Sequence, residues 1–422
     1  MNAPGPWRWI PSLYFAQGIP YVAVNFLSVV MYKNLGVSNT EIALYTSWLN
    51  LPWVIKPLWS PLVDLLGRKR QWIVGLQFLI GAAFAGVALA VPGPEPLRLT
   101  LAVFWLIAFA SASHDIAADG FYMLALRQQS QAAFVGVRST FFRLAMLAGQ
   151  GGLVYLAGVL TERTGQASSA WASVFAVLAV GFGLVAAWHL ISLPWPERDR
   201  PSPRTGTLLA DFAAVLLAFF RRPGIVQVLA FLLLFRFAEA QLLKLVTPFM
   251  LDSREAGGLG LRTQDVGLAY GTLGAIAVTL GGLAGGWVIS RGGLRRLMWP
   301  LVICMHVPNL VFVALAAWQP TSLALVSAAI CVEQFGYGFG FAAYMVFMLM
   351  VAEADDNPHK TAHYALCTGF MALGVMLPGM AAGWLQELMG YTGFFIWVCV
   401  ATIPSFLAVA AVRIDPAYGR RD

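Results

Sequence analysis

Apolar runs of about twenty residues recur along the whole chain, and they limit the environment in which it can fold. The runs at 72–91, 301–318 and 394–412 contain few or no charged residues. Each is close to the ~20 residues that a helix needs to cross the ~30 Å hydrocarbon core of a bilayer. Over all 422 residues, 59% are hydrophobic and 11% are charged, whereas soluble domains carry about a quarter charged residues. The sequence therefore predicts an all-α integral membrane protein.

Twelve membrane-spanning helices can be placed, in two groups of six. A proline- and charge-rich segment separates the groups and cannot span, and its second part, 208–220, has the pattern of an amphipathic helix on the membrane surface. We predict an N-terminal six-helix bundle at 1–193, a cytoplasmic linker at 194–222, and a C-terminal six-helix bundle with a short tail at 223–422. The expected spans are 9–31, 42–59, 72–91, 99–126, 134–160, 170–193, 224–250, 266–290, 297–318, 322–351, 362–388 and 394–412.

Lysine and arginine gather on one side of these spans. If the N-terminus is cytoplasmic, the clusters at 68–70 and 295–296 and most other basic residues lie on the inner side. Cytoplasmic loops carry this excess in membrane proteins, so we predict a multi-pass inner-membrane protein with both termini in the cytoplasm. The net charge of +7 at pH 7 is then a consequence of topology, and no nucleic-acid partner is expected.

Enzymatic motifs are missing from the sequence. No glycine-rich phosphate-binding loop followed by lysine and serine or threonine occurs, which argues against an ATP-driven pump. The four cysteines lie in apolar segments without paired spacing. We expect no enzyme, no cofactor and no metal site. His189 and His306, each alone on an apolar helix, are interpreted as packing residues.

Two similar turns occupy equivalent places in the two groups of six. The turn at 60–70 follows the second span and the turn at 286–296 follows the eighth, with Gly67 matching Gly293 and Arg70 matching Arg296. Equivalent turns indicate parallel repeats about an axis along the membrane normal. The pair resembles the signature of the major facilitator superfamily, although serine replaces a glycine in the first copy and the acid in the second. The resemblance implies the major facilitator fold and an inner gate formed by Asp64, Gly67 and Arg68.

Three further stretches carry a narrower resemblance. They are Phe-Ala-Gln-Gly-Ile-Pro-Tyr at 15–21, Lys-Pro-Leu-Trp-Ser-Pro-Leu-Val-Asp at 56–64 and His-Asp-Ile-Ala-Ala-Asp-Gly at 114–120. They are similar to stretches of the AmpG-type muropeptide permeases, and parts are shared with acetyl-CoA transporters and some siderophore permeases. The resemblance implies inward transport of a muropeptide or amino-sugar oligosaccharide. Siderophores and acyl-CoA-like anions remain alternative substrates.

Charged residues inside the spans are the first candidates for a site, because a charge at mid-membrane costs at least ~3 kcal/mol. Asp115 and Asp119 share a face of the fourth span, and His114 could border the same cavity. We interpret the two acids as proton carriers. The alternative is a structural ion pair with Arg143 in the fifth span.

The seventh and tenth spans carry a second group. Arg236 and Glu239 could neutralise each other, or Arg236 and Lys244 could hold an anionic substrate. In the tenth span Glu333 is a third candidate for proton coupling, and Gln334 is a candidate for substrate contact. Glycines 336, 338 and 340 follow them and would allow close helix packing or bending.

A polar stripe in the first span completes the candidates. Gln17, Tyr21 and Asn25 recur at four-residue spacing, and such a stripe must face protein or water rather than lipid. We interpret it as cavity lining, with interhelical hydrogen bonding as the alternative. Lys56 is either a snorkelling anchor or part of the cavity, and the resemblance favours the latter.

These observations predict a proton-coupled secondary transporter that works by alternating access as a monomer surrounded by lipid. A non-transporting membrane scaffold or receptor is the alternative from a different class. The charges inside the spans argue against it, because a scaffold has little need of them.

Overall fold

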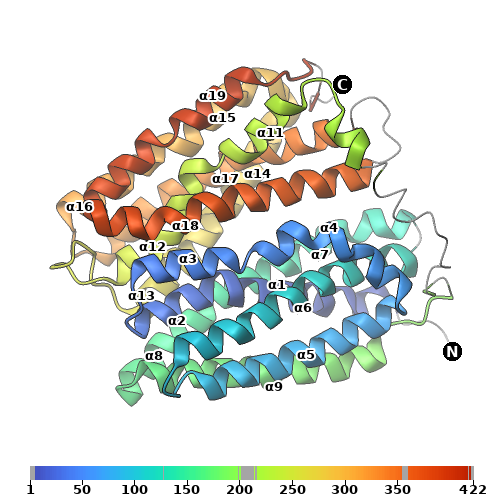
Figure 1. The fold of residues 1–422 in the computed structure, drawn as a ribbon, viewed down its shortest axis with the longest axis horizontal. Coiled ribbons are helices and arrows are strands. Elements are labelled where there is room, and N and C mark those ends of the chain that lie inside the picture. Colours follow the sequence, from blue (N-terminus) through green and yellow to red (C-terminus); the bar gives the residue numbers. More distant parts are fainter. Residues whose placement is uncertain are drawn as a thin grey trace. The chain divides into compact units, whose positions relative to one another are not determined.

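The computed structural model describes residues 5–126, 128–197, 199–200, 213, 216–353, 360–416 and 418–419; the side chains of 61–62, 64–65, 128–133, 135 and 360–362 lie outside this description. The described residues form helices and connecting segments without a β-strand (Figure 1). Ten helical segments among them are long and apolar enough to cross a membrane. The expectation of an all-α membrane protein is confirmed.

The two remaining expected spans are accounted for by breaks in the helices. The last apolar segment, His363–Ala411, is interrupted at Gly390, whose φ of 68° lies in the left-handed region that favours glycine. The expected second span consists of α3 (Asn39–Trp48) and α4 (Leu51–Leu65), with Leu49 and Asn50 between them. The described helices are therefore consistent with twelve crossings.

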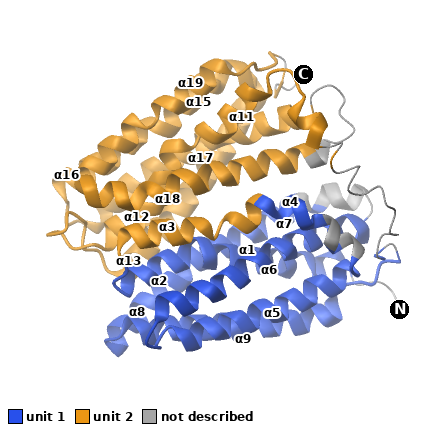
Figure 2. Ribbon diagram, viewed as in Figure 1, with its two compact units in different colours: residues 1–37, 55–205 blue, residues 38–54, 206–422 orange. Residues whose placement is uncertain are grey.

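Two compact units make up the chain (Figure 2). Unit 1 contains Met1–Val37 and Ile55–Thr205, and unit 2 contains Ser38–Val54 and Gly206–Asp422. Chain order would place α3 with the first group of spans. The structure groups it with unit 2 because it packs along α18 (Lys360–Val400).

Unit 1 is built around the pairs α5 with α9, α5 with α6, and α1 with α7. The first span is a nearly continuous helix that includes a π-helical stretch, η2, and the fifth span includes another, η3. The elements of unit 1 are η1 (Pro6–Arg8), α1 (Ile10–Val22), η2 (Ala23–Leu27), α2 (Ser28–Asn34), α4 from Ile55 onward, α5 (Lys69–Ala90), α6 (Pro96–Ala125), α7 (Gln128–Leu147), η3 (Ala148–Leu153), α8 (Val154–Thr164) and α9 (Ala167–Ser192).

Unit 2 is built around the pairs α14 with α17, α12 with α18, and α18 with α3. Most of the expected amphipathic helix at 208–220 lies outside the described residues. Within this range, residues 216–220 are described and are helical. Besides α3 and α18, the elements are α11 (Ile225–Leu234), α12 (Phe237–Leu251), α13 (Thr263–Val266), η4 (Gly267–Gly274, π-helical), α14 (Ala275–Gly292), α15 (Leu294–His306), η5 (Val307–Asn309), α16 (Leu310–Trp318), α17 (Leu323–Glu353) and α19 (Ile403–Ala411).

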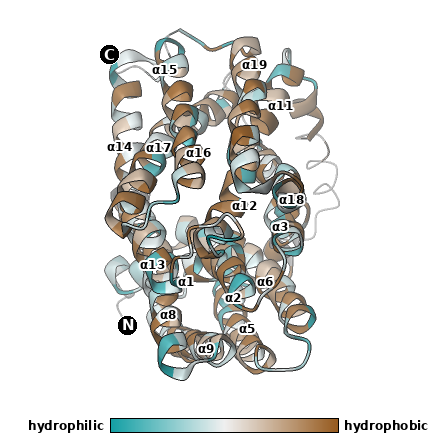
Figure 3. Cartoon of the chain, turned by 90° about the vertical axis from the view of Figure 1, so that its left-hand side faces the viewer, coloured by the Kyte–Doolittle hydropathy of each residue, from teal (hydrophilic) through white to brown (hydrophobic). Residues whose placement is uncertain are grey.

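Hydropathy follows the helices. Hydrophobic residues cover much of each long helix, whereas hydrophilic residues gather at helix ends and in connecting segments (Figure 3). Large apolar side chains such as Leu184, Leu283 and Leu407 are more than 60% exposed to the surroundings of the protein. Such exposure would be costly in water and suits helices that face lipid.

Glycines on α17 determine how closely its neighbours approach. A Cβ atom at Gly336 would lie 2.4 Å from the Cys304 carbonyl oxygen of α15, and one at Gly340 would lie 2.5 Å from that of Leu301. On another face of α17, a Cβ atom at Gly338 would lie 2.0 Å from the Val278 carbonyl oxygen of α14. Small residues permit this close backbone contact between membrane helices. The expected role of these glycines in packing is thus seen, on two faces.

Candidate functional site

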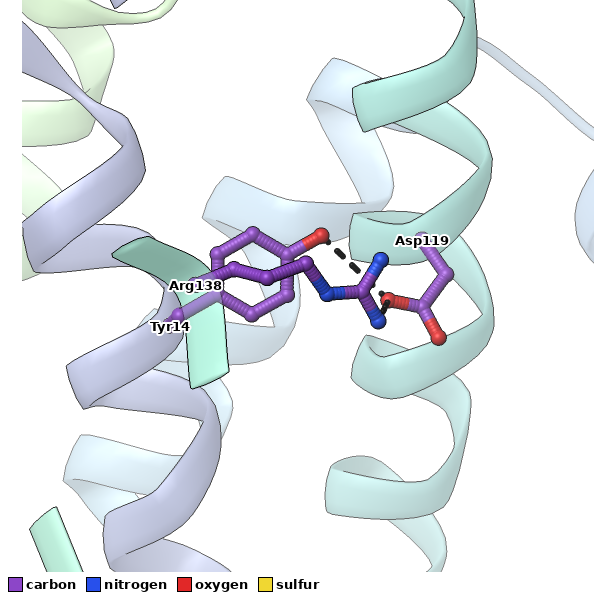
Figure 4. Close-up of polar contacts among 3 residues, drawn as sticks. All are labelled: Tyr14, Asp119 and Arg138. Atoms are coloured by element: carbon purple, nitrogen blue, oxygen red, sulfur yellow. Dashed lines mark hydrogen bonds and ion pairs between the residues drawn. The ribbon is translucent and has the colours of Figure 1, made fainter. Parts of the chain in front are cut away.

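Asp119 lies in a polar contact inside unit 1 (Figure 4). Its Oδ1 atom accepts hydrogen bonds from Arg138 Nη2 at 2.9 Å and from the Tyr14 hydroxyl at 3.3 Å. The Arg138 guanidinium also lies over the rings of Tyr14 and Tyr122, 4.6 and 5.3 Å from their centroids. Arg138 therefore supplies to Asp119 the countercharge that a bound proton would otherwise supply.

A structural ion pair with Arg143 was the alternative interpretation of the two acids, whereas the structure pairs Asp119 with Arg138. Both arginines lie on α7, but Asp119 is close to the end of α6, where the chain turns back into α7. Arg138 is five residues nearer to that end than Arg143, which corresponds to ~7.5 Å along a helix. Arg143 is exposed, and Asp115 is half-buried one turn from Asp119.

His114 belongs to a buried chain of hydrogen bonds. Its Nε2 atom lies 3.0 Å from Gln77 Nε2, and Gln77 Oε1 lies 2.8 Å from His189 Nδ1. The Nε2 atom of His189 lies 2.8 Å from the Ser12 hydroxyl. His114 is 1% exposed and His189 and Gln77 are fully buried. The ring thus points to α5 and joins α1, α5, α6 and α9, rather than bordering a cavity shared with Asp115.

This chain can be satisfied with both histidines neutral. With the Gln77 amide as placed, Nε2 donates to His114 and Oε1 accepts from His189, which in turn accepts from Ser12. Buried polar groups need such partners, since an unsatisfied one costs about 1–3 kcal/mol. His189 is a bridging residue and more than the packing residue that we expected.

The polar stripe of the first span is placed on α1 and η2. Gln17 is 8% exposed, and no hydrogen bond to its Oε1 is found among the described residues. Tyr21 and Asn25 are half-buried, and Asn25 Nδ2 donates to the Tyr21 carbonyl oxygen at 3.1 Å. A Cβ atom at Gly18 would lie 2.6 Å from Ala145 Cβ, so α1 and α7 approach closely beside this stripe. Of the three residues, Gln17 offers the buried acceptor.

The turn between α4 and α5 binds the start of the linker. Asp199 Oδ1 accepts from the backbone N–H of Lys69 at 2.8 Å, and its Oδ2 accepts from that of Arg70 at 3.1 Å. A carboxylate at a helix N-terminus satisfies free N–H groups and is favoured by the helix dipole. Trp195 lies under the Arg70 guanidinium at 3.9 Å and near that of Arg68 at 5.5 Å.

The expected gate residues are therefore only partly visible. The side chain of Asp64 lies outside the described residues. The N-terminus of α5, which follows this turn, is bound by Asp199. Gly67 has ordinary contacts at the Cβ position, whereas its counterpart Gly293 has a φ of 78° and needs glycine. Lys56, on α4, is half-buried.

Unit 2 contains a group of ionisable side chains that are mostly buried. Arg236 Nη2 donates to the Tyr337 hydroxyl at 2.6 Å, and its guanidinium lies 4.9 Å from the Phe341 ring centroid. Glu239 is fully buried, and neither of its carboxylate oxygens has a hydrogen bond among the described residues. The two residues act on each other electrostatically, but the guanidinium is hydrogen-bonded to Tyr337. Arg236 and Glu239 therefore interact electrostatically without a direct hydrogen bond among the described residues.

Glu333 lies in the same group. It is fully buried, and its Oε2 accepts from Gln334 Nε2 at 2.9 Å, while its Oε1 has no hydrogen bond among the described residues. Tyr270, on η4, interacts electrostatically with Glu333 and Glu239 and is hydrogen-bonded to Gln334. The sequence analysis missed Tyr270 and Tyr337, because tyrosine in an apolar span gives no signal of its own.

Lys244 is 5% exposed, two turns further along α12 from Arg236. Its Nζ atom donates to the Thr46 hydroxyl of α3 at 3.2 Å. Gly379 lies beside both helices, since a Cβ atom there would be 2.9 Å from Ser47 Oγ and 3.3 Å from Lys244 Cγ. A buried ammonium group with a neutral acceptor is a favourable place for an anionic ligand.

A cluster of polar side chains at the start of α3 holds this helix within unit 2. Asn39 Nδ2 donates to Gln386 Oε1 at 2.7 Å and to the Tyr391 hydroxyl at 2.9 Å, and Tyr391 donates to Asp252 Oδ2 at 2.5 Å. A Cβ atom at Gly383 would lie 2.1 Å from the Asn39 carbonyl oxygen, so α18 touches the α3 backbone. The position of Thr46 beside Lys244 depends on these contacts, which hold α3 against α18.

The comparisons with known proteins agree with this architecture. The chain is 26% identical over 415 residues to the anhydromuropeptide permease of Escherichia coli, which covers 97% of this chain and 80% of the permease. It is also 26% identical over 408 residues to the putative transporter AmpG 4 of Rickettsia felis, with 93% of each chain covered.

Solved structures with the same fold include a bacterial homolog to the human lysosomal transporter Spinster, at a TM-score of 0.71, 16% identity and 96% coverage of each chain. The nucleoside transporter NupG matches with a TM-score of 0.70 and 16% identity over 97% of this chain and 100% of that chain. The model of the Major Facilitator Superfamily matches residues 12–363. This protein is therefore a multi-pass membrane transporter that belongs to the major facilitator superfamily.

Proposed function

We propose that this protein is a proton-coupled secondary transporter that imports muropeptides or related amino-sugar oligosaccharides across a bacterial inner membrane. The observation that carries the proposal is the similarity to an anhydromuropeptide permease along 97% of this chain. The buried charges in the spans of unit 2 favour a transporter over a non-transporting scaffold. Burying a charge costs free energy, and a scaffold has no function that requires it.

The candidate residues suit the chemistry of such a substrate. A muropeptide combines a sugar rich in hydroxyl and amide groups with a peptide that carries carboxylates. Lys244 and Arg236 would hold the carboxylates, since both are buried cations. Sugar and peptide amides would be bound by the neutral polar residues Gln17, Tyr21, Asn25 and Gln334, with Lys56 and Arg143 as the further candidates.

Transport would proceed by alternating access, in which the six-span halves at 1–193 and 223–422 move against each other around the substrate. The linker at 194–222 and both termini would be cytoplasmic, as the excess of basic residues on that side supports. Asp64, Gly67 and Arg68 would form the inner gate, and Asp115 and Glu333 would carry protons, whereas Asp119 is already paired with Arg138. A monomer in contact with lipid would suffice for this cycle.

Counterflow in proteoliposomes tests the substrate class. Vesicles containing the purified full-length protein are loaded with unlabelled anhydromuropeptide and diluted into labelled anhydromuropeptide at equal pH on both sides. We expect transient accumulation of label, at least tenfold above empty vesicles. A hundredfold excess of external unlabelled anhydromuropeptide should abolish it, whereas a ferric siderophore or acetyl-CoA should not.

Two outcomes would contradict the proposal. Counterflow of a labelled ferric siderophore or of labelled acetyl-CoA, without counterflow of the muropeptide, would assign a different substrate. Absence of counterflow with all three would favour the non-transporting scaffold.

A further inference from the structure

Two fully buried carboxyl groups, those of Glu239 and Glu333, lie in unit 2. They have fewer hydrogen-bond donors than two carboxylate anions require. No hydrogen bond reaches either oxygen of Glu239, and one reaches a single oxygen of Glu333, among the described residues. Glu239 and Glu333 also interact with each other electrostatically. An ionised carboxylate buried without partners costs far more free energy than its neutral form. At least one proton is therefore expected on this pair.

Among the described residues, one guanidinium group, two phenol groups and, further away, one ammonium group lie near Glu239 and Glu333. Arg236 directly precedes α12 and acts on Glu239, while Tyr270 of η4 and Tyr337 of α17 supply phenol groups. Lys244 is bound to Thr46, further along α12. One guanidinium balances one carboxylate, so the second carboxyl group must be neutral for the net charge of the group to be zero.

We propose that Glu239 and Glu333 share one transported proton, so that Glu239 is a proton-carrying residue of this transporter together with Glu333. This inference rests on the proposed function. With the proton bound, the group consists of one carboxyl group, one carboxylate and one guanidinium, and its charge is zero. Loss of the proton leaves two carboxylates and one guanidinium, with a net charge of −1 and no change in any covalent bond other than O–H.

The charge count explains how proton binding would be tied to movement. A neutral group can stay buried, whereas a group of charge −1 needs water or a cation. Release of the proton therefore requires hydration of the site, and reburial of the site requires a new proton.

Asp119 differs from this pair in the features that matter for proton carriage. Its side chain is 42% exposed and is already paired with Arg138.

Tyr270 is a positioning residue for the pair, because η4 packs against α17 there. A Cβ atom at Gly274 would lie 3.3 Å from Gln334 Cγ, and π-helical stretches within helices often accompany functional sites.

Infrared difference spectroscopy of the full-length protein in lipid tests the inference without any substrate. Between acidic and alkaline medium, the wild type should lose the C=O stretching band of one protonated buried carboxyl group. Glu239→Gln and Glu333→Gln should each lack that band, because the remaining carboxylate is balanced by Arg236. Arg236→Gln should roughly double it. Glu255→Gln, in an exposed loop, is the matched control and should leave the band unchanged.

Folding is checked by thermal unfolding of each variant. Both single variants should unfold at or above the wild-type temperature, and the double variant, with Arg236 uncompensated, should unfold below it. A band that persists unchanged in Glu239→Gln would overturn the inference, as would its loss in Glu255→Gln.

Transport separates this inference from the proposed function. Both single variants should retain counterflow within about threefold of wild type and lose at least tenfold of the accumulation driven by a pH gradient. Normal gradient-driven accumulation in Glu239→Gln would contradict the inference. If the wild type lacks counterflow while both variants lack the band, the shared proton stands and the proposed substrate fails.

Discussion

Alanine in place of Gly338 is expected to lower the unfolding temperature of the purified protein by about 6–12 °C, as overpacking of ~3 kcal/mol does in a unit of ~200 residues. The new Cβ atom would lie 2.0 Å from the Val278 carbonyl oxygen and 3.0 Å from the Gly282 nitrogen. Both atoms belong to the backbone of α14, so no side chain can turn away to make room. The two helices must move apart, and Glu333, five residues earlier on α17, moves with them.

Gly286 provides the matched control for this substitution. It lies on α14, the partner helix, and a Cβ atom there would have no heavy atom within 4 Å. Because alanine is favoured over glycine in helix interiors by up to ~1 kcal/mol, Gly286→Ala should leave the unfolding temperature unchanged or raise it slightly. Equal unfolding temperatures for the two variants would show that the close contact of α14 with α17 contributes little to stability.

Methionine in place of Lys244 is expected to separate transport from stability. The ammonium group is 5% exposed and is hydrogen-bonded to the neutral hydroxyl of Thr46. Burying a charge costs several kcal/mol of desolvation, so an apolar group of similar length in place of Lys244 should leave the stability unchanged or raise it. A hydrogen bond to a charged group contributes ~1.5–3 kcal/mol, so the affinity for an anionic substrate should fall about 10- to 150-fold. Concentration-dependent counterflow measures the affinity, and thermal unfolding measures the stability.

Thr46→Val is the matched variant, since it removes the acceptor and keeps the charge. It should lower the unfolding temperature slightly, because the ammonium loses a buried partner, and should retain most of the affinity. If Lys244→Met instead loses stability and keeps its affinity, Lys244 is an anchor for α3 and takes no part in substrate binding.

The fold was largely predictable from the sequence, for a physical reason. Each span must satisfy its own backbone inside the bilayer, so an apolar run of the right length already specifies a helix. Charged residues are rare in such runs because their burial is costly, and this rarity alone makes Glu239, Lys244 and Glu333 candidates. The expected bounds of α6 and α17 are accordingly close to the observed Pro96–Ala125 and Leu323–Glu353.

Pairings between spans could not be predicted in the same way. Arg138 and Arg143 lie on one helix, and only the depth at which α7 passes α6 makes Arg138 the partner of Asp119. His189 looked isolated because its partners, Gln77 and Ser12, are more than a hundred residues away in the chain. The packing of α3 against α18 also could not be predicted, because it depends on tertiary contacts that leave no pattern in the local sequence.

The most direct measurement is the pH of a weakly buffered medium around de-energised proteoliposomes when anhydromuropeptide is added. If the protein imports muropeptide together with protons, the external pH should rise on addition and return when the proton gradient is dissipated, and vesicles without protein should show no change. Saturable uptake of the muropeptide with no change in external pH would contradict proton coupling. Neither uptake nor a pH change would contradict the proposed function as a whole.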